Sequence, residues 1–141
     1  MKLKEIVGYL PYGLMMYGSS EIWKLIGIDP IGVGKEDIGL ILENGTGLYD
    51  GASILEHSPI LRPLSDLTKK ITVDGEEFVP ISILYGGDWA LSQGNVNALM
   101  SNINDEVLNF PYKFIQLLYK WHFDIHGLIE RGEAIDMNEV D

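Results

Sequence analysis

Residues 109–132 read NFPYKFIQLLYKWHFDIHGLIERG, the longest stretch of the chain in which apolar residues recur every three or four positions. That spacing places side chains on one face of a helix. The apolar face comprises Phe114, Leu117, Leu118, Trp121, Ile125, Leu128 and Ile129. Burial of each such side chain contributes about 1.5–3 kcal/mol. We therefore expect the rest of the fold to pack on this stretch.

The start and the interior of the stretch carry helix signals of their own. Asn109 is a good N-cap residue, and Pro111 suits a first helical turn because its missing N–H is not needed there. Gly127 costs about 1 kcal/mol relative to Ala in a helix interior. We expect a C-terminal helix that is kinked at Gly127 or divided into helices over about 111–124 and 125–131.

The chain before this stretch favours strands and tight turns. Short apolar and aromatic runs flank two turn dipeptides, Asn44-Gly45 and Asp74-Gly75. Such dipeptides are typical of two-residue β-hairpin turns. Strands therefore come first and helices later, without strict alternation. We predict one α+β domain over residues 1–141, in which an N-terminal antiparallel sheet of hairpins packs against C-terminal helices.

The composition is that of a globular protein, with 46% hydrophobic and 22% charged residues. The chain has no cysteine, which excludes a disulfide framework, a thiolate metal site and a cysteine nucleophile. No apolar run approaches the roughly 18 residues of a membrane span. The first residues lack the apolar core and cleavage site of a signal peptide. We expect a soluble, cytoplasmic protein without membrane association.

The net charge of −11 is unevenly distributed along the chain. Residues 1–70 carry 7 basic and 9 acidic residues, a net of −2, whereas residues 71–141 carry 3 and 12, a net of −9. Such an excess of acid repels phosphate backbones and anionic membranes, so we expect no nucleic-acid partner. The acidic half could instead imitate DNA as a decoy for a nucleic-acid-binding protein. The simpler interpretation is a solvated surface.

His122, His126 and Glu130 are spaced at i, i+4 and i+8. On a continuous helix they would share one face, and two histidines four residues apart can chelate a divalent metal. The stretch has no His-Glu-x-x-His motif, however, and Gly127 lies between the possible ligands. A structural role beside the buried face is therefore the competing interpretation. From the sequence we assign no metal site, no cofactor and no catalytic residue.

Arg62 stands out because its neighbours in sequence are apolar or proline. A guanidinium that is partly buried needs a carboxylate partner. We expect a structural ion pair between Arg62 and Asp66, with a ligand-gripping role for Arg62 as the alternative.

Two further motifs do not meet the requirements of the chemistry they suggest. His57-Ser58 lacks the Gly-x-Ser-x-Gly elbow of a hydrolase. The run from Gly32 to Lys35 lacks the spacing of a phosphate loop, and acidic residues come directly after it. We interpret the run as a turn.

Aromatic residues are frequent in the first half of the chain, at Tyr9, Tyr12, Tyr17, Trp23 and Tyr49. Such side chains either fill the core of a sheet or form an interface when exposed. We expect most of them in the core and the exposed minority on a surface for a partner or for self-association.

Three stretches together resemble a family of short, uncharacterised proteins from phage-like regions of gut-bacterial genomes. These stretches are Leu10–Leu14, Pro59–Thr68, and Trp121–Ile125 with Gly127–Glu130 and Ala134–Asp136. The resemblance implies a phage or mobile-element setting and no particular activity. It favours a non-catalytic, intracellular module that binds a protein partner or itself. A metal-dependent enzyme that uses His122, His126 and Glu130, or an acidic decoy, remains the alternative.

Overall fold

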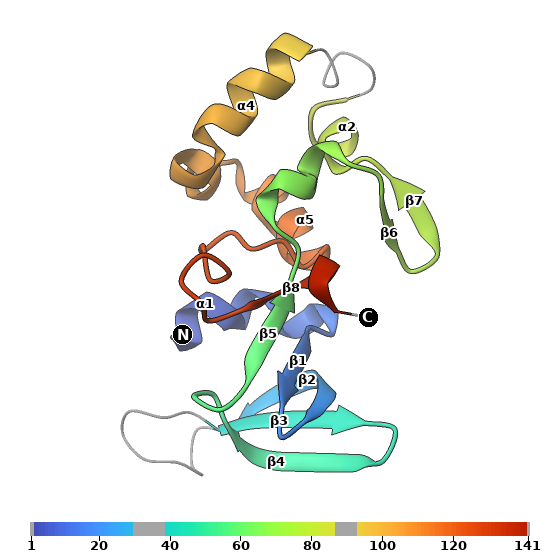
Figure 1. The fold of residues 1–141 in the computed structure, drawn as a ribbon, viewed down its shortest axis with the longest axis vertical. Helices are drawn as coiled ribbons and strands as arrows, with labels where there is room; N and C mark the ends of the chain where they lie inside the picture. The colour runs from blue at the N-terminus through green and yellow to red at the C-terminus, as the bar shows by residue number, and fades with distance from the viewer. Residues whose placement is uncertain (1, 30–38, 87–92, 141) are drawn as a thin grey trace.

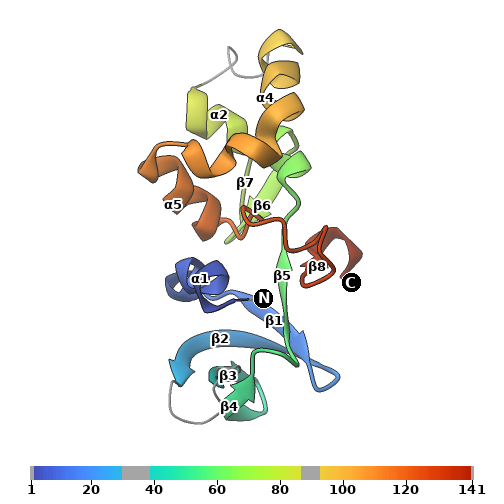
Figure 2. The ribbon, with the colours of Figure 1, turned by 90° about the vertical axis from the view of Figure 1, so that its left-hand side faces the viewer.

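The computed structural model describes residues 2–29, 39–86 and 93–140, and the chain forms an α+β structure, as the sequence predicts. The molecule is elongated, with a β-sheet at one end, helices at the other, and strand β5 running between them (Figures 1 and 2). The turn predicted over residues 32–35 lies outside the described residues. In the described part of the chain, no helix is both long and apolar enough to cross a membrane.

Six strands form a sheet in the order β4-β3-β2-β1-β5-β8. They are β1 (Met15–Gly18), β2 (Glu21–Asp29), β3 (Gly39–Asn44), β4 (Gly47–Ser53), β5 (Ser58–Leu61) and β8 (Ile135–Asp136). The five N-terminal strands pair antiparallel, as predicted, whereas β8 comes from the C-terminal end of the chain and pairs parallel to β5. The sheet is therefore completed by a segment that the sequence pattern did not identify as a strand.

Both predicted hairpin turns are present. Gly45 and Thr46 connect β3 to β4, one residue later than the predicted dipeptide Asn44-Gly45, because Asn44 still pairs with Gly47. The side-chain oxygen of Asn44 accepts hydrogen bonds from the backbone N–H groups of Thr46 and Gly47, at 2.9 and 3.1 Å. Asp74 and Gly75 connect β6 (Ile71–Val73) to β7 (Glu76–Phe78). Both of these turn residues have positive φ angles, 52° and 82°, as a type I′ turn requires.

The remaining elements are helical and short. They are α1 (Leu3–Ile6), η1 (Val7–Tyr12), η2 (Leu64–Thr68), α2 (Pro80–Tyr85), α4 (Gln93–Glu106), η3 (Val107–Asn109), α5 (Tyr112–Lys120) and η4 (Met137–Glu139), where η denotes a 3₁₀ helix. Helices α1 and η1 cover the sheet, whereas α2, α4 and α5 gather at the opposite end of the molecule (Figure 2).

The predicted C-terminal helix is only half correct. Helix α5 ends at Lys120, because His122 adopts a left-handed backbone conformation with φ of 61°. The next residues pair instead with Arg62, which directly follows β5. The N–H of Arg62 donates to the carbonyl of His122, and the N–H of Asp124 donates to the carbonyl of Arg62, both at 2.8 Å. Residues 121–134, called here the 121–134 segment, form turns, so the helices expected beyond Lys120 are wrong.

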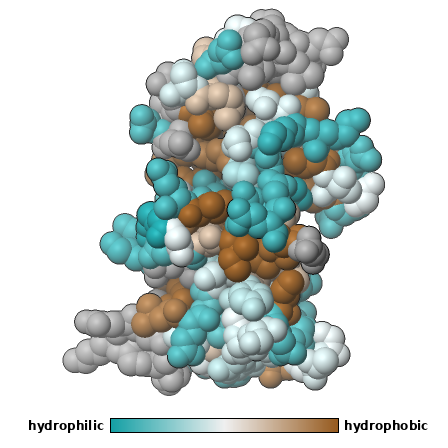
Figure 3. Space-filling model, in the orientation of Figure 1, coloured by the Kyte–Doolittle hydropathy of each residue, from teal (hydrophilic) through white to brown (hydrophobic). Residues whose placement is uncertain are grey.

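Two hydrophobic clusters lie on either side of this segment. The sheet cluster joins the inner face of the sheet to α1 and η1, and the helical cluster joins α5, η2, α2 and the end of α4. Tyr119 packs against both clusters, so α5 connects the two ends of the molecule. Figure 3 shows the face that carries the C-terminal end, where hydrophobic side chains reach the surface around β8 between more hydrophilic ends.

Candidate functional site

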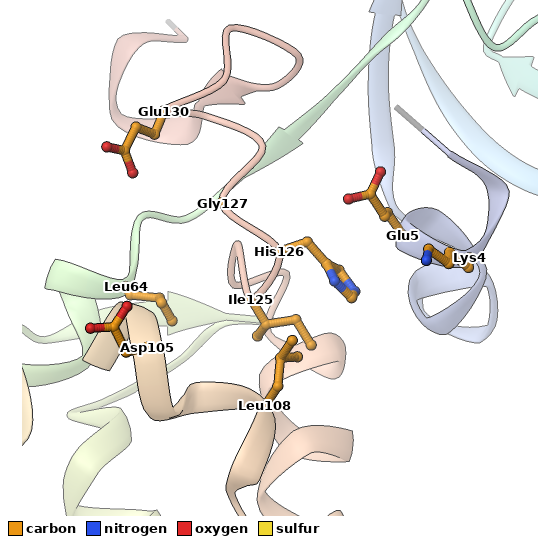
Figure 4. Close-up of a pocket in the computed structure, with 9 residues that line it drawn as sticks. All are labelled: Lys4, Glu5, Leu64, Asp105, Leu108, Ile125, His126, Gly127 and Glu130. Atoms are coloured by element: carbon orange, nitrogen blue, oxygen red, sulfur yellow. The ribbon is translucent and has the colours of Figure 1, made fainter. Parts of the chain in front are cut away.

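The three residues considered as metal ligands are not brought together. His126 and Glu130 line one cleft, of about 610 Å³, whereas His122 lines another. Within the first cleft His126 points towards the wall formed by Glu5, and Glu130 lies on the opposite side (Figure 4). The i, i+4 spacing fails because the helix has ended before His122. Among the described residues, no group of three His, Cys, Asp or Glu side chains could hold a metal ion.

His126 has a structural contact instead. Its Nε2 lies 3.0 Å from the hydroxyl of Tyr119, and the two rings are 6.1 Å apart between centroids. Burial lowers the pKa of His126, although the charges of Glu5 and Asp124 oppose this effect. The contact fixes the 121–134 segment against α5.

An ion pair that the sequence did not suggest closes the same region. The guanidinium of Arg131 donates to both carboxylate oxygens of Glu5, at 2.5 and 3.2 Å, and also pairs with Glu133. The hydrogen bond from Arg131 lowers the pKa of Glu5 to about 2, against the opposing effect of burial. Glu5 and Arg131 are 126 residues apart, so no local pattern indicates their contact.

Asp124 is a second residue that sequence reasoning missed. Its carboxylate is buried and accepts hydrogen bonds from the backbone N–H groups of Leu128 and Ile129, at 2.8 and 2.9 Å. These bonds hold the turn that contains Gly127, whose φ of 71° is left-handed. The role of Asp124 is therefore to shape the 121–134 segment.

The predicted ion pair between Arg62 and Asp66 is replaced by other contacts. Arg62 donates to the backbone carbonyls of Trp121 and Thr72, at 3.0 and 3.1 Å. Asp66 lies 3.3 Å from the ammonium group of Lys69 and accepts from the side chain of Asn138 at 2.8 Å. Burial lowers the pKa of Arg62, and the charge of Asp66 opposes that shift from a distance. Arg62 thus joins the residue after α5 to strand β6 through their backbone carbonyls.

Most of the N-terminal aromatic residues are core residues. Tyr9 is fully buried, and its hydroxyl donates to the carbonyl of Phe123 at 2.5 Å. Trp23 is buried and donates to the carbonyl of Gly18. Of the five aromatic residues singled out, Tyr17 is exposed and the other four are buried or half-buried. An interaction surface cannot therefore be mainly aromatic in this half of the chain.

The largest exposed apolar surface in the sheet is the face that points away from α1. Its members, called here the outer sheet face, are Met15, Tyr17, Ile22, Lys24, Ile26, Ile41, Glu43, Leu48 and Asp50. The opposite face is buried in the sheet cluster. On the outer sheet face the exposed fractions reach 45% for Tyr17, 42% for Ile26 and 64% for Leu48. A shallow depression of about 470 Å³ lies on this face next to the β3–β4 turn, lined by Met15, Ile22, Lys24, Glu43, Asn44 and Gly45.

The strand register arranges four of these residues in one row across the sheet. Met15 pairs with Lys24, Lys24 with Glu43, and Glu43 with Leu48. The row therefore reads apolar, positive, negative, apolar from β1 to β4. Cross-strand partners point to the same side of a sheet, so all four side chains project from the outer sheet face.

Comparisons with known proteins gave no match to a family model, to a curated protein or to a solved structure. A function for the chain is therefore inferred from its own surface chemistry.

Proposed function

We propose that this protein is a protein-interaction module and that the outer sheet face is its contact surface. The supporting observation is that Tyr17, Ile26 and Leu48 are exposed on one side of a sheet whose other side is fully packed. Exposed apolar side chains that gather on one face are typical of binding sites, whereas scattered ones are not. An interaction module also agrees with the absence of a catalytic motif in the sequence.

We propose a second copy of the chain as the occupant of this surface. A two-fold axis parallel to the strands, between β2 and β3, places Lys24 of one copy over Glu43 of the other. The same operation places Met15 of one copy over Leu48 of the other. The row of four residues is therefore complementary to itself in both charge and hydrophobicity, which a two-fold interface requires.

The expected association is weak and concentration-dependent. Stable interfaces use about 20–30 residues on each side, and the outer sheet face has nine. The row of four residues carries one positive and one negative charge, and Asp50 adds a negative charge beside it, whereas the chain as a whole carries −11. Repulsion elsewhere on the surface limits other modes of self-contact, so association is confined to the neutral row.

A charge-reversal series tests this proposal. In the proposed dimer, residue 24 of each copy faces residue 43 of the other copy, so this contact occurs twice. Lys24→Glu makes it a contact between two carboxylates, and Glu43→Lys makes it a contact between two ammonium groups. We expect each single variant to weaken dimerisation and the double variant K24E/E43K to restore it, because the row is again self-complementary. Sedimentation equilibrium from micromolar to millimolar protein measures the dimer fraction. A native chain that stays monomeric throughout, or a double variant that fails to recover, contradicts the proposal.

A pair of leucines supplies a matched test of the hydrophobic contribution. Leu48 and Leu55 have nearly the same exposed fraction, 64% and 65%, but Leu55 lies in the turn after β4, outside the outer sheet face. We expect Leu48→Asp to abolish dimerisation and Leu55→Asp to leave it unchanged. Equal effects of the two substitutions would indicate a different interface.

The cellular setting is part of the proposal. We place the module in the cytoplasm of a host that carries a phage or mobile element, which the acidic, cysteine-free composition and the resemblance described above support. Localisation of a tagged chain by fractionation checks it: recovery in an envelope fraction would contradict it.

A further inference from the structure

A second cleft, of about 700 Å³, lies where η1, β1, β2, the β6–β7 turn and the end of α5 meet. Its volume is within the range of about 300–1,000 Å³ that is typical of small-molecule sites. One wall is apolar and is formed by Leu10, Pro11, Met15 and Ile26. The cleft therefore has room for a molecule with an apolar body.

The charged residues of this cleft are mainly basic, although the protein is strongly acidic. Lys24 comes from β2, Lys120 from the last turn of α5, and His122 lies two residues after the end of α5. Asp74, in the β6–β7 turn, is the acidic residue of the cleft. The stem of Lys24 lies over Gly13, where an added Cβ would come within 3.0 Å of the Lys24 Cε. Because Gly13 has no side chain, the aliphatic part of Lys24 can lie against its backbone within the cleft.

His122 is held in position by its backbone and by its ring. Its carbonyl accepts from the N–H of Arg62 at 2.8 Å, and its Nε2 lies 2.8 Å from the carbonyl oxygen of Tyr12. A carbonyl oxygen can only accept, so Nε2 carries the hydrogen and Nδ1 is left to face a ligand. A left-handed backbone at a non-glycine residue is strained, and such strain is often found at functional sites.

We propose that this cleft binds an organic phosphate, a phosphate monoester attached to an apolar body, through Lys24, Lys120 and His122. Lysine ammonium groups are compact point charges that suit phosphate, and two of them, Lys24 and Lys120, line the cleft. The ester's apolar part lies against Leu10, Pro11 and Ile26. The cleft shares Lys24, Met15 and Ile26 with the outer sheet face, whereas Lys120 and His122 lie outside that face, so substitutions of Lys120 and His122 test this inference without altering the proposed dimer contact.

Ligand binding is expected to add a proton to His122. Burial lowers the pKa of His122, which the hydrogen bond to Tyr12 partly offsets, so the free ring is neutral near pH 7. The other charged groups around the ring are Arg62, Lys24, Lys120 and Asp74. A bound dianion favours the protonated ring, and both ring nitrogens then donate hydrogen bonds.

Titration with phenyl phosphate, followed by amide chemical shifts and by calorimetry, tests the proposal. We expect saturable binding with shifts centred on residues 120–122 and 10–13. Lys120→Met should weaken binding about three- to tenfold. Lys113→Met is the matched control, since Lys113 is an exposed lysine of the same helix that does not line the cleft, and it should leave binding unchanged.

Asp74→Asn gives a test with the opposite sign. Asparagine tolerates the left-handed conformation of this turn, so the hairpin stays intact while a repulsive charge is removed. We expect phenyl phosphate to bind about two- to fivefold more tightly. Unchanged or weaker binding by this variant contradicts the proposed position of the phosphate.

His122→Asn tests the proton. Asparagine keeps the left-handed backbone accessible but cannot be protonated. Between about pH 8 and about pH 6 the native chain should gain affinity relative to H122N, because only the native ring takes up a proton; the protonation of the ester itself affects both proteins equally. The proposal is overturned if phenyl phosphate does not bind, if benzoate binds as tightly, or if Lys120→Met has no effect.

Discussion

Helix α5 and the 121–134 segment adjoin each other and have the same spacing of apolar residues. Their apolar side chains, however, are buried to different extents. Within α5 one residue, Leu118, is fully buried. Within the 121–134 segment Trp121, Phe123, Ile125 and Leu128 are all buried, with exposed fractions of 5% or less. The irregular segment is therefore the better-packed of the two, and the regular helix lies nearer to the surface.

The difference teaches that an apolar period predicts burial more safely than it predicts conformation. A helix satisfies its own backbone groups, whereas an irregular segment must find partners elsewhere. The 121–134 segment finds them in Arg62, which bonds on both sides of Phe123, and in the carboxylate of Asp124. Such partners allow the segment to bury Trp121, Phe123 and Ile125 in the helical cluster and Leu128 in the sheet cluster.

The largest expected effect comes from truncating the side chain that the segment buries most deeply. Phe123→Ala removes a fully buried ring and should lower the free energy of unfolding by about 3–5 kcal/mol. Phe114→Ala, in half-buried surroundings on α5, should lower it by roughly half as much. Urea denaturation compares the two variants. Equal losses would show that the segment is no better packed than the helix.

The next effect concerns the carboxylate that shapes the segment. Asp124→Ala leaves two N–H groups, those of Leu128 and Ile129, without their acceptor, and should destabilise the fold by about 2–4 kcal/mol. Asp124→Asn keeps one acceptor oxygen and should cost less. Denaturation midpoints measure both, with hydrogen exchange at Leu128 as the local readout. A stability close to that of the native chain for Asp124→Ala would mean that water replaces the carboxylate.

A pair of glycines distinguishes the 121–134 segment from a regular helix, here α4, by the sign of the effect on stability. Gly127 has a φ of 71° and open space around its Cα, so Gly127→Ala should cost about 1–2 kcal/mol through backbone strain alone. Gly94 lies in helix α4, also with open space, and Gly94→Ala should be neutral or stabilising by up to about 1 kcal/mol. Thermal unfolding of both variants provides the comparison. A tolerated alanine at position 127 would show that the turn can change its conformation.

The smallest effect is the pH dependence carried by Glu5, which joins α1 to the segment. Its pKa is about 2 in the folded state against an ordinary value of 4.5. Stability from this pair is therefore present above about pH 4.5 and is lost as the pH falls towards 2. Glu5→Gln should lower the urea midpoint at neutral pH and show a flatter decline in acid, with Glu130→Gln in the same cleft as control. If the urea midpoints of the native chain and of Glu5→Gln fell in parallel as the pH is lowered, the Glu5–Arg131 ion pair would not account for the loss of stability in acid.

Much of the local structure could be predicted because it depends on residues close in sequence. Asp74-Gly75 forms the expected hairpin, since both residues tolerate the positive φ angles that the turn requires. The β3–β4 hairpin also forms, with its turn one residue later than expected and with the side chain of Asn44 bonded to the turn. The start of α5 lies within one residue of the prediction, although Pro111 is the N-cap residue and Asn109, the expected cap, ends η3 instead. The metal hypothesis could not be settled in this way, because the relative positions of His122 and His126 depend on where the helix ends.

The contacts that position the candidate sites were beyond sequence reasoning for a similar reason. Arg62 was assigned to Asp66, its nearest carboxylate in the chain, but the fold brings the carbonyls of Trp121 and Thr72 closer. Glu5 meets Arg131 across nearly the whole chain. A partner chosen by proximity in sequence is wrong wherever tertiary packing supplies a better one.

The sequence by itself determined the α+β class, the hairpins, and the burial of Leu118, Trp121, Ile125 and Leu128, because side-chain hydrophobicity and turn preferences are local properties. Only the tertiary structure decided where α5 stops, that β8 completes the sheet beside β5, and that His122 and His126 face different clefts. The physical reason is that backbone groups after Lys120 have two competing sets of partners. The extended chain at Arg62, which the fold places beside them, provides the set that is adopted.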